Sequence, residues 1–285
     1  MTTNELLKIK SRIFNLSSSS FSVAYNGTMM SSGKFIIPNF INHNENVNRV
    51  YLMVSHAEVP NAFYLVNQYN NILYINSIAY TIPSGNYNAS NLMTTLLNLL
   101  PASFSVTYSS IFQKYTISST SAFTISYLNS SISRIMGLNR TSDMVGVLAN
   151  DKYTVTLPNC VNFLPTARLN VRSSILQLEN FQSNDGSSDI LLSLQNNASQ
   201  NGVITYTNRS NLKYHVDLEC VNEIDIRITD DSNRELDFNG VSWFLTLRVD
   251  YEYKYIPTSN TFSKIIKNNN DFLVKYLDFL HEQES

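Results

Sequence analysis

The chain has 285 residues, of which 43% are hydrophobic and only 15% are charged, and its net charge is −2. Nucleic-acid binding usually needs a basic face, so this balance gives no reason to expect nucleic-acid specificity. No run approaches the roughly 18 uninterrupted apolar residues of a membrane-spanning helix, and residues 1–10 lack the apolar run of a secretory signal. A weakly charged surface removes a common barrier to association, which favours a protein that packs against others.

The N-terminal part predicts an arm followed by three strands. Residues 1–17 have a short amphipathic start and lead into a run of serines, which is typical of a flexible arm outside the fold. Alternating apolar residues then predict short strands at 21–25 and 34–37 and a longer strand at 49–58. Because His56 continues the apolar face of the longer strand, we expect it to be a hydrogen-bonded core residue rather than a metal ligand.

Residues 67–149 differ in sequence pattern from the strands on either side, and this difference predicts an inserted unit. Two short strands come first, and leucines at helical spacing then predict a helix that begins at Asn88 or Ser90 and ends before Pro101. A hairpin, a further strand and a helical turn over 132–138 complete a ββ-α-βββ arrangement.

Residues 150–257 return to the alternating pattern of the N-terminal strands. We therefore predict a mainly β protein: a single antiparallel jelly roll of eight strands, built from 18–66 and 150–257 and interrupted by a small α+β insertion domain over 67–149. In this prediction 1–17 is an N-terminal arm and 258–285 is a C-terminal tail helix.

Two long strands close the predicted jelly roll and carry the clearest pattern in the chain. Isoleucine alternates with polar residues over 221–230, and a second alternating run occupies 241–256 as far as Pro257. The acidic turn between them predicts that the two strands pair with each other. Phe244 is the one bulky residue on the polar side of the second strand. The apolar faces predict five core residues: Ile226, Ile228, Trp243, Leu245 and Leu247.

The tail over 258–285 predicts a polar hinge and then a helix that Asp271 caps. Its apolar residues need a surface to cover, because so short a helix is not stable alone in water. These residues are Phe272, Leu273, Tyr276, Leu277, Phe279 and Leu280. Docking on its own domain and docking on a neighbouring molecule both satisfy this need.

No constellation of residues indicates catalysis, so we expect no enzyme and no catalytic, cofactor-binding or metal site. The four histidines are scattered without metal-ligand spacing: His43, His56, His215 and His281. The densest group of carboxylates is Asp230, Asp231, Glu235 and Asp237. Its spacing loosely resembles a calcium loop but lacks the glycine and the distal glutamate of one, so an acidic turn is the better interpretation. A glycoside hydrolase would need two carboxylates about 5–10 Å apart in a cleft, and no pair is singled out.

Cys160 and Cys220 are the only cysteines, and their separation without a CxxC pattern predicts two free thiols in a reducing compartment. The 17 tyrosines permit carbohydrate stacking. However, Tyr251, Tyr253 and Tyr255 continue a buried strand face, which favours a structural role.

Several segments resemble parts of the minor capsid (penton) proteins of virophages and polinton-like elements. They are 80–87 (Tyr-Thr-Ile-Pro-Ser-Gly-Asn-Tyr), 92–96, 131–138, and the closing strands over 224–230 and 236–248. The similarity leaves the two chain ends unsupported, and its motifs are turns and strands, so it transfers no catalytic residue. In that family the vertex protein is a single jelly roll with an inserted domain, and five copies fill each fivefold vertex of an icosahedral shell.

The resemblance implies a structural capsid protein in the virion of an icosahedral double-stranded DNA virus or virophage, made in the host cytoplasm or a viral factory. Its implied partners are four further copies of itself, in a homopentamer, and a major capsid protein of the double-jelly-roll type. The alternative is a glycan-binding or spike-type minor virion protein that mediates host attachment, with the polar insertion 67–149 contacting a host-surface glycan.

Overall fold

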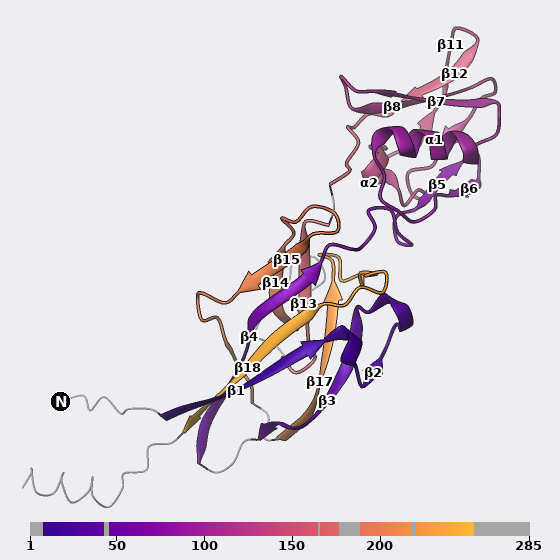
Figure 1. Ribbon diagram of the computed structural model, residues 1–285. Coiled ribbons are helices and arrows are strands. Elements are labelled where there is room, and N and C mark those ends of the chain that lie inside the picture. The colour runs from indigo at the N-terminus through magenta and orange to yellow at the C-terminus, as the bar shows by residue number, and fades with distance from the viewer. Residues whose placement is uncertain (1–7, 43–45, 165, 177–188, 218–219, 254–285) are drawn as a thin grey trace, which may run out of the picture.

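The computed structural model describes residues 8–42, 46–164, 166–176, 189–217 and 220–253. These residues form antiparallel sheets that are arranged as two bodies, one beyond the end of the other (Figure 1). We call them the lower body and the upper body, as they stand in Figure 1. Each body has a hydrophobic core of its own, so the chain contains two separate packed units. No helix in the described part of the chain is long and apolar enough to cross a membrane.

The lower body consists of two sheets of five strands each. In the first, strands lie in the order β1 (Lys8–Ser17), β18 (Phe244–Tyr253), β4 (Val47–Pro60) and β15 (Val203–Thr207), and β16 (Tyr214–His215) also pairs with β4. In the second, the order is β14 (Ile190–Gln195), β13 (Arg168–Arg172), β17 (Cys220–Thr229), β3 (Ser32–Asn42) and β2 (Val23–Ala24). Strands from before and after the upper body therefore lie side by side in both sheets.

This arrangement confirms the predicted fold class, a mainly β, antiparallel, jelly-roll-like fold interrupted by an α+β unit. Two of the ten strands in the lower body, β2 and β16, have only two residues each. The predicted count of eight strands therefore depends on how such short segments are counted.

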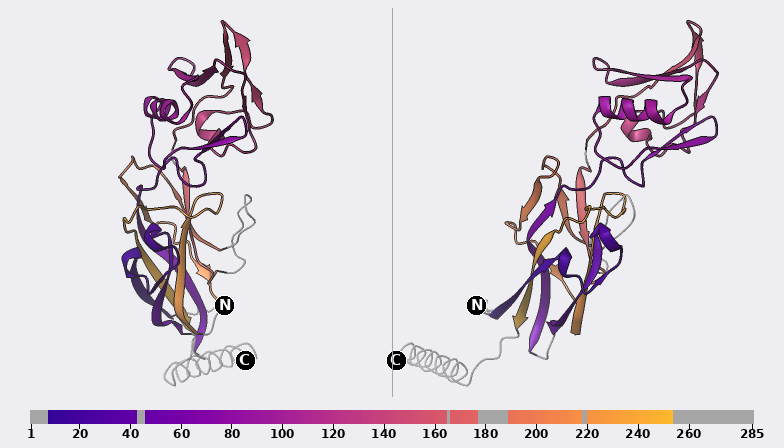
Figure 2. Two further views of the ribbon diagram at one scale, coloured as in Figure 1. Left: turned by 90° about the vertical axis from the view of Figure 1, so that its right-hand side faces the viewer. Right: turned by 45° about the vertical axis from the view of Figure 1, so that its right-hand side comes forward.

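The upper body contains two four-stranded sheets and two helices, and Figure 2 shows it beyond the strand ends of the lower body in two further views. One sheet has the order β10 (Met144–Val145), β9 (Thr124–Ile125), β5 (Ile72–Ile75), β6 (Ile78–Thr81). The other has the order β11 (Val147–Ala149), β12 (Lys152–Thr156), β8 (Lys114–Ser119), β7 (Phe104–Ser109). The helices are α1 (Ala89–Leu99) and α2 (Ser133–Met136).

Helix α1 begins and packs as its sequence predicts. The Asn88 side chain accepts a hydrogen bond from the backbone N–H of Asn91 at 2.9 Å, which satisfies one of the free donors at the helix start. Leu92 and Leu96 are fully buried in the core of the upper body. The helix therefore covers the upper sheets with its leucine face.

The return to the lower body comes later than predicted. β12 pairs with β8, and Val155 and Leu157 belong to the upper core, so the chain does not leave the upper body at residue 150. The alternation of β12 is the same as that of a strand in the lower body, because period-two alternation does not depend on which sheet a strand joins.

The prediction that β17 and β18 pair with each other is wrong. β17 pairs with β3 and β13, whereas β18 pairs with β1 and β4, and residues 230–243 cross from one sheet to the other. Both strands nevertheless bury the predicted face. The five predicted core residues, Ile226, Ile228, Trp243, Leu245 and Leu247, are each exposed by no more than 1%. Two strands that face each other across a core alternate in the same way as two strands that lie edge to edge.

The prediction of a flexible arm is wrong for residues 8–17, which form the edge strand β1 along the whole length of β18. Leu16 is buried, and the Phe14 ring lies 4.8 Å from that of Phe40. The serines that follow resemble a linker in sequence, but Ser18 donates its backbone N–H to the carbonyl of Trp243 at 3.1 Å. The rest of the predicted arm, and the predicted tail helix with all its apolar residues, lie outside the described residues.

Trp243 occupies the point where the chain enters β18, and it contacts three other segments. Its ring is fully buried and packs edge-on against Phe21 and Phe35, with centroid distances of 5.5 and 6.3 Å. Its indole N–H donates to the carbonyl of Met30 at 2.7 Å, and its backbone N–H donates to the Ser18 hydroxyl at 3.1 Å. One side chain thus joins the crossing segment to the strands at the start of the fold.

We expect Trp243→Ala to lower the free energy of unfolding by about 3–5 kcal/mol, because it removes a buried ring and leaves a cavity. Urea unfolding followed by circular dichroism measures the change. Phe244→Ala is the matched control: its side chain is 51% exposed at the adjacent position, so a change within about 0.5 kcal/mol is expected. Equal effects of the two variants would contradict the assigned strand register.

Deletion of residues 1–17 should destabilise the lower body, since β18 loses its edge partner and the core loses Leu16. Burial of a leucine alone contributes about 1.5–3 kcal/mol. Thermal unfolding of the deletion is compared with that of a control lacking only residues 1–7, which precede β1. If both deletions melt at the temperature of the full chain, β1 does not contribute to stability as the pairing implies.

Candidate functional site

The two histidines in the described residues, His56 and His215, have different partners and do not form a common site. His56 is not in the core, contrary to prediction: its side chain is 41% exposed, with ring nitrogens 3.2 Å from Glu58 Oε1 and 3.4 Å from the Thr207 hydroxyl. A β-bulge in the pairing of β4 with β18 places Thr246 opposite His56 but Leu247 opposite Val54. The bulge shifts the alternation by one residue and turns His56 to the outer face.

The other predicted metal-site candidates are also separated. His215 packs edge-on against Tyr51 on the outer face of the first sheet, at a centroid distance of 5.8 Å. His43 and His281 lie outside the described residues. Within the described ranges, no group of three or more His, Cys, Asp or Glu side chains is placed to hold a metal ion.

The acidic turn uses its carboxylates to stabilise its own backbone. Asp230 accepts hydrogen bonds from the backbone N–H groups of Ser232 and Arg234, at 2.8 and 2.9 Å, and pairs with the Arg234 guanidinium at 2.7 Å. Asp237 accepts from the backbone N–H of Asn239 at 2.8 Å. These contacts agree with the interpretation of the segment as an acidic turn.

Cys160 and Cys220 are both exposed free thiols, as predicted. The tyrosine series on β18 is structural where it is described, because Tyr251 is buried and donates its hydroxyl proton to the carbonyl of Phe40 at 3.3 Å. Tyr251 is therefore not available to stack on a sugar.

Polar side chains of the second sheet that alternation assigns to solvent are buried. Arg172 is fully buried, and its guanidinium bonds Asp189 at 2.7 Å and the hydroxyl of Thr229 at 2.9 Å. Arg227 binds the other oxygen of Asp189 at 3.2 Å. This ion pair network joins β13, β17 and the start of β14, and sequence reasoning missed it because the three segments are distant in the chain.

Asparagine side chains anchor the two connections between the bodies. Asn61 is buried and donates its amide to the carbonyls of Ala198 and Ser199, at 2.9 and 3.1 Å, where the chain leaves the lower body. On the return, the amide of Asn196 donates to the carbonyl of Thr166 at 3.0 Å. A neutral amide offers both a donor and an acceptor without the cost of desolvating a charge.

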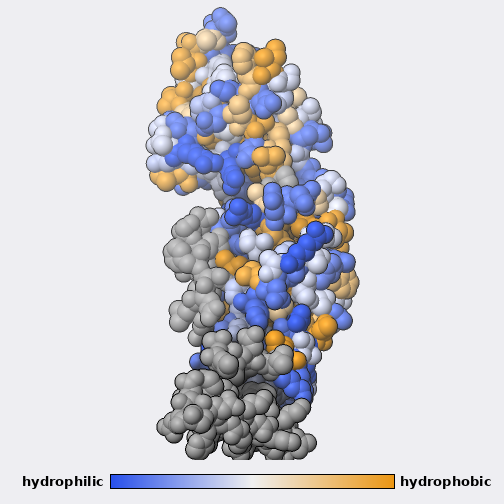
Figure 3. All heavy atoms as spheres, turned by 90° about the vertical axis from the view of Figure 1, so that its left-hand side faces the viewer, coloured by the Kyte–Doolittle hydropathy of each residue, from blue (hydrophilic) through white to orange (hydrophobic). Residues whose placement is uncertain are grey.

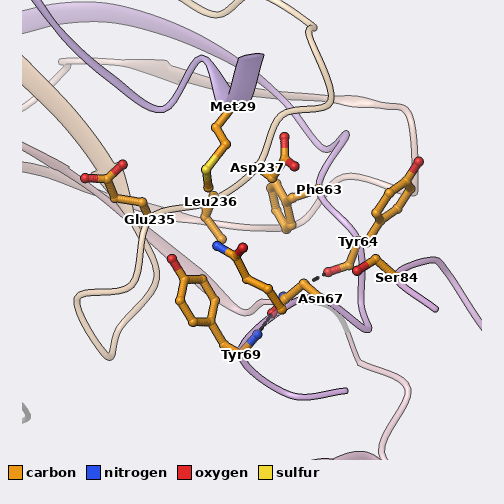
Figure 4. Close-up of a pocket in the computed structure, with 10 residues that line it drawn as sticks. Met29, Phe63, Tyr64, Asn67, Tyr69, Ser84, Glu235, Leu236 and Asp237 are labelled. Carbon is orange, nitrogen blue, oxygen red and sulfur yellow. Dashed lines mark hydrogen bonds between the residues drawn. The ribbon is translucent and has the colours of Figure 1, made fainter. Parts of the chain in front are cut away.

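A cavity opens at this junction, between the 235–237 turn of the lower body and the 64–69 loop of the upper body (Figure 4). The cavity has a volume of about 90 Å³, well below the roughly 300–1,000 Å³ of sites for drug-sized ligands. Its lining residues are Met29, Phe63, Tyr64, Asn67, Gln68, Tyr69, Ser84, Glu235, Leu236 and Asp237. We call it the junction cavity.

Local hydrogen bonds hold the loop that forms one wall of the junction cavity. The Asn67 side chain accepts from the backbone N–H of Tyr69 at 3.0 Å and donates to the carbonyl of Tyr64 at 3.3 Å, as the dashed lines in Figure 4 show. The rings of Tyr64 and Tyr69 remain 37% and 38% exposed. Two aromatic side chains are thus presented on a loop whose backbone is fixed.

The opposite wall carries two carboxylates. Glu235 accepts hydrogen bonds from the hydroxyls of Ser31 and Ser32 at 3.0 and 2.9 Å, and also from the amide of Asn26. The ion pairs found among the described residues include neither Glu235 nor Asp237. The cavity therefore combines an apolar floor with a negative rim.

Some of the exposed apolar side chains lie on edge strands of the described sheets. In the upper body, Val147 and Leu148 on the edge strand β11 are 69% and 61% exposed. In the lower body, Ile9 and Ile13 on the edge strand β1 are 53% and 64% exposed. Figure 3 shows apolar side chains in several separate groups on one face, with hydrophilic side chains between them. Edges of this kind are the usual places at which sheets associate.

Burial raises the pKa of the Tyr115 hydroxyl above its ordinary value, and the nearby Tyr108 adds to the shift. Tyr115 is fully buried in the upper core and donates to the carbonyl of Ala89 at the start of α1, at 2.8 Å. Its neutral form is therefore part of the packing between α1 and β8.

No protein-family model and no curated protein sequence matches this chain. Among solved structures, the selenomethionine-labelled mavirus penton protein is similar, with a TM-score of 0.43 and 12% identity over 86% of this chain and 100% of that chain. The Sputnik virophage structure determined by cryo-electron microscopy at 3.5 Å is also similar, with a TM-score of 0.38 and 14% identity over 86% of this chain and 99% of that chain. Both matches span most of each chain at low identity.

The raised pKa of Tyr115 predicts that the free energy of unfolding falls at alkaline pH. Because its pKa is raised on folding, the neutral hydroxyl stabilises the fold fully below the unfolded pKa of about 10, and this contribution is lost as pH rises above that value. The Tyr115→Phe variant should lose less stability than the unmodified chain between pH 9 and 11. At neutral pH its free energy of unfolding should be lower by about 0.5–1.5 kcal/mol, because one hydrogen bond is lost. Thermal unfolding across this pH range measures both effects, with Tyr25→Phe, whose ring is 51% exposed, as the control. An unchanged alkaline slope in Tyr115→Phe would contradict the assignment.

Proposed function

We propose that this chain is a structural protein of an icosahedral viral capsid and that it forms a homopentamer at the vertex. The proposal includes contact with a major capsid protein of the double-jelly-roll type and a location in the virion. The resemblance of 80–87, 131–138 and the closing strands to penton proteins of virophages supports this assignment.

The free edges of the lower body are the observation that carries the proposal. A ring of identical copies uses head-to-tail contacts, so each copy must offer two different surfaces. The first sheet of the lower body ends in β1 on one side and in β15 on the other. These two edges differ in length and in chemistry, as head-to-tail contact requires.

β1 is a ten-residue strand with one edge paired to β18 and no strand on its other edge among the described residues. It carries Lys8, Lys10 and Arg12 on one face and the exposed Ile9 and Ile13 on the other. Cations on an edge strand oppose its pairing with a second copy of itself, while the unpaired backbone groups still favour a different partner strand.

β15, at the other side of the same sheet, is a five-residue strand without charged residues. Val203 at its start is 54% exposed. An uncharged edge can accept a cationic strand without like-charge repulsion. The lower body therefore supports an asymmetric contact between β1 of one copy and the β15 side of the next.

Mass measurement tests the proposal. Native mass spectrometry of the purified chain, and of virions dissociated under mild conditions, should give a species of five times the 32.4 kDa chain mass. A trimer in both samples would overturn the pentamer but keep the capsid role. A stable monomer that is absent from particles would overturn both.

Substitution on β1 separates assembly from folding. Ile9→Asp with Ile13→Asp should leave the melting temperature within about 2 °C, because exposed positions contribute little to stability, and should lower the pentamer fraction at least about tenfold if the edge is an interface. Ile111→Asp with Phe112→Asp, in the turn between β7 and β8, is the matched control, since these residues are 85% and 68% exposed and lie outside the sheet edges. Pentamers that form equally in both variants would show that β1 is not the contact.

A further inference from the structure

We propose that the junction cavity binds the basic side chain, lysine or arginine, of a partner polypeptide. This is a ligand site in addition to the sheet edges, and it needs neither the pentamer nor β1. The choice of a polypeptide over a free amine rests on the proposed function, in which the neighbours of the chain are other proteins.

The floor of the cavity suits the aliphatic stem of such a side chain. Phe63 and Leu236 are exposed by only 5% and 4%, and they line the cavity together with Met29 (Figure 4). Phe63 also packs edge-on against Phe238, at a centroid distance of 6.1 Å, so the floor belongs to the packed core and does not collapse into the cavity. Lysine and arginine bury their methylene stems on apolar surface while the charged head stays at a polar rim.

The tyrosine rings add a preference for a cation. Ammonium and guanidinium groups are attracted to aromatic faces within about 6 Å of the ring centroid. Tyr69 already has one such neighbour, the guanidinium of Arg234, at 5.5 Å. That guanidinium also pairs with Asp230 at 2.7 Å.

The charge of the lining determines which ligands fit. Glu235 and Asp237 lie in the wall, and no lysine, arginine or histidine is among the described residues that line the cavity. Their hydrogen-bond donors are neutral hydroxyl, amide and backbone groups. A bound cation would gain two opposite charges at the edge of an apolar site, whereas an anionic side chain would meet repulsion.

The test is an amide NMR titration of the full chain with capped tripeptides. Acetyl-Gly-Lys-Gly-amide and acetyl-Gly-Arg-Gly-amide should produce saturable shifts at Gln68, Tyr69, Leu236 and Asp237. Acetyl-Gly-norleucine-Gly-amide has the same stem without the charge, and we expect it to bind at least about tenfold more weakly.

Variants assign the effect to the carboxylates. Glu235→Gln combined with Asp237→Asn keeps an acceptor oxygen at each position but removes both charges, and it should weaken the lysine peptide at least about fivefold. Asp143→Asn is the matched control, because Asp143 also accepts a backbone N–H, from Tyr127 at 2.9 Å, on an exposed turn outside the cavity. Tyr69→Leu is a second variant, which keeps an apolar side chain and removes the ring, and it should also weaken binding.

Four results would overturn the proposal. They are the absence of saturable shifts in the cavity, equal binding of the norleucine peptide, unchanged binding in the charge-removed variant, and binding of butylamine without binding of the lysine peptide. N-acetylglucosamine serves as a further probe: shifts at the same residues with this sugar, in the absence of peptide binding, would assign the cavity to a glycan instead.

Discussion

The burial of Trp243 between two sheets is the interaction on which the lower body depends. The chain has to pass from β17 in one sheet to β18 in the other, and this crossing leaves backbone groups without strand partners. At its end, the backbone of Trp243 exchanges hydrogen bonds with Ser18, and its indole N–H donates to the carbonyl of Met30. The same ring packs on Phe21 and Phe35. The burial of Trp243 therefore links the stability of the N-terminal segment to that of the last strand.

The low charge of the chain is compensated by neutral polar side chains that form specific bonds. Asn61 and Asn196 hold the two connections between the bodies, and Asn67 fixes the loop at the junction cavity. The charged residues that are buried are paired, as in the contact of Arg172 with Asp189. Buried charges are costly unless they are paired. The pair of Arg172 with Asp189 lies where three segments of the lower body meet.

The two proposals use different properties of the same fold. The sheet edges offer unpaired backbone groups and exposed apolar side chains, which suit contact with another strand. The junction cavity offers a negative rim over an apolar floor, which suits a single inserted side chain. Because the cavity lies between the bodies, a side chain bound in it would contact both the 64–69 loop and the 235–237 turn.

The sequence by itself determined the local elements and the buried faces. Asn88 and the leucine spacing predicted α1, and alternation identified Ile226, Ile228 and Leu245 as core residues, because helix and strand periods follow from the backbone geometry of each element. The residue types also predicted the free thiols and the acidic turn correctly. The period of a helix or strand and the hydrogen bonds of a turn depend on neighbours that are close in the chain.

Only the tertiary structure decided which strands lie side by side. It separated β17 from β18, added β1 to the first sheet, assigned β12 to the upper body and, through a bulge, turned His56 outward. It also brought Tyr69 and Glu235, more than half the chain apart in sequence, to the two walls of one cavity. The physical reason is the same in each case: a strand's alternation records that one face is buried, whereas the identity of its neighbours depends on contacts between distant segments that leave no period in the sequence.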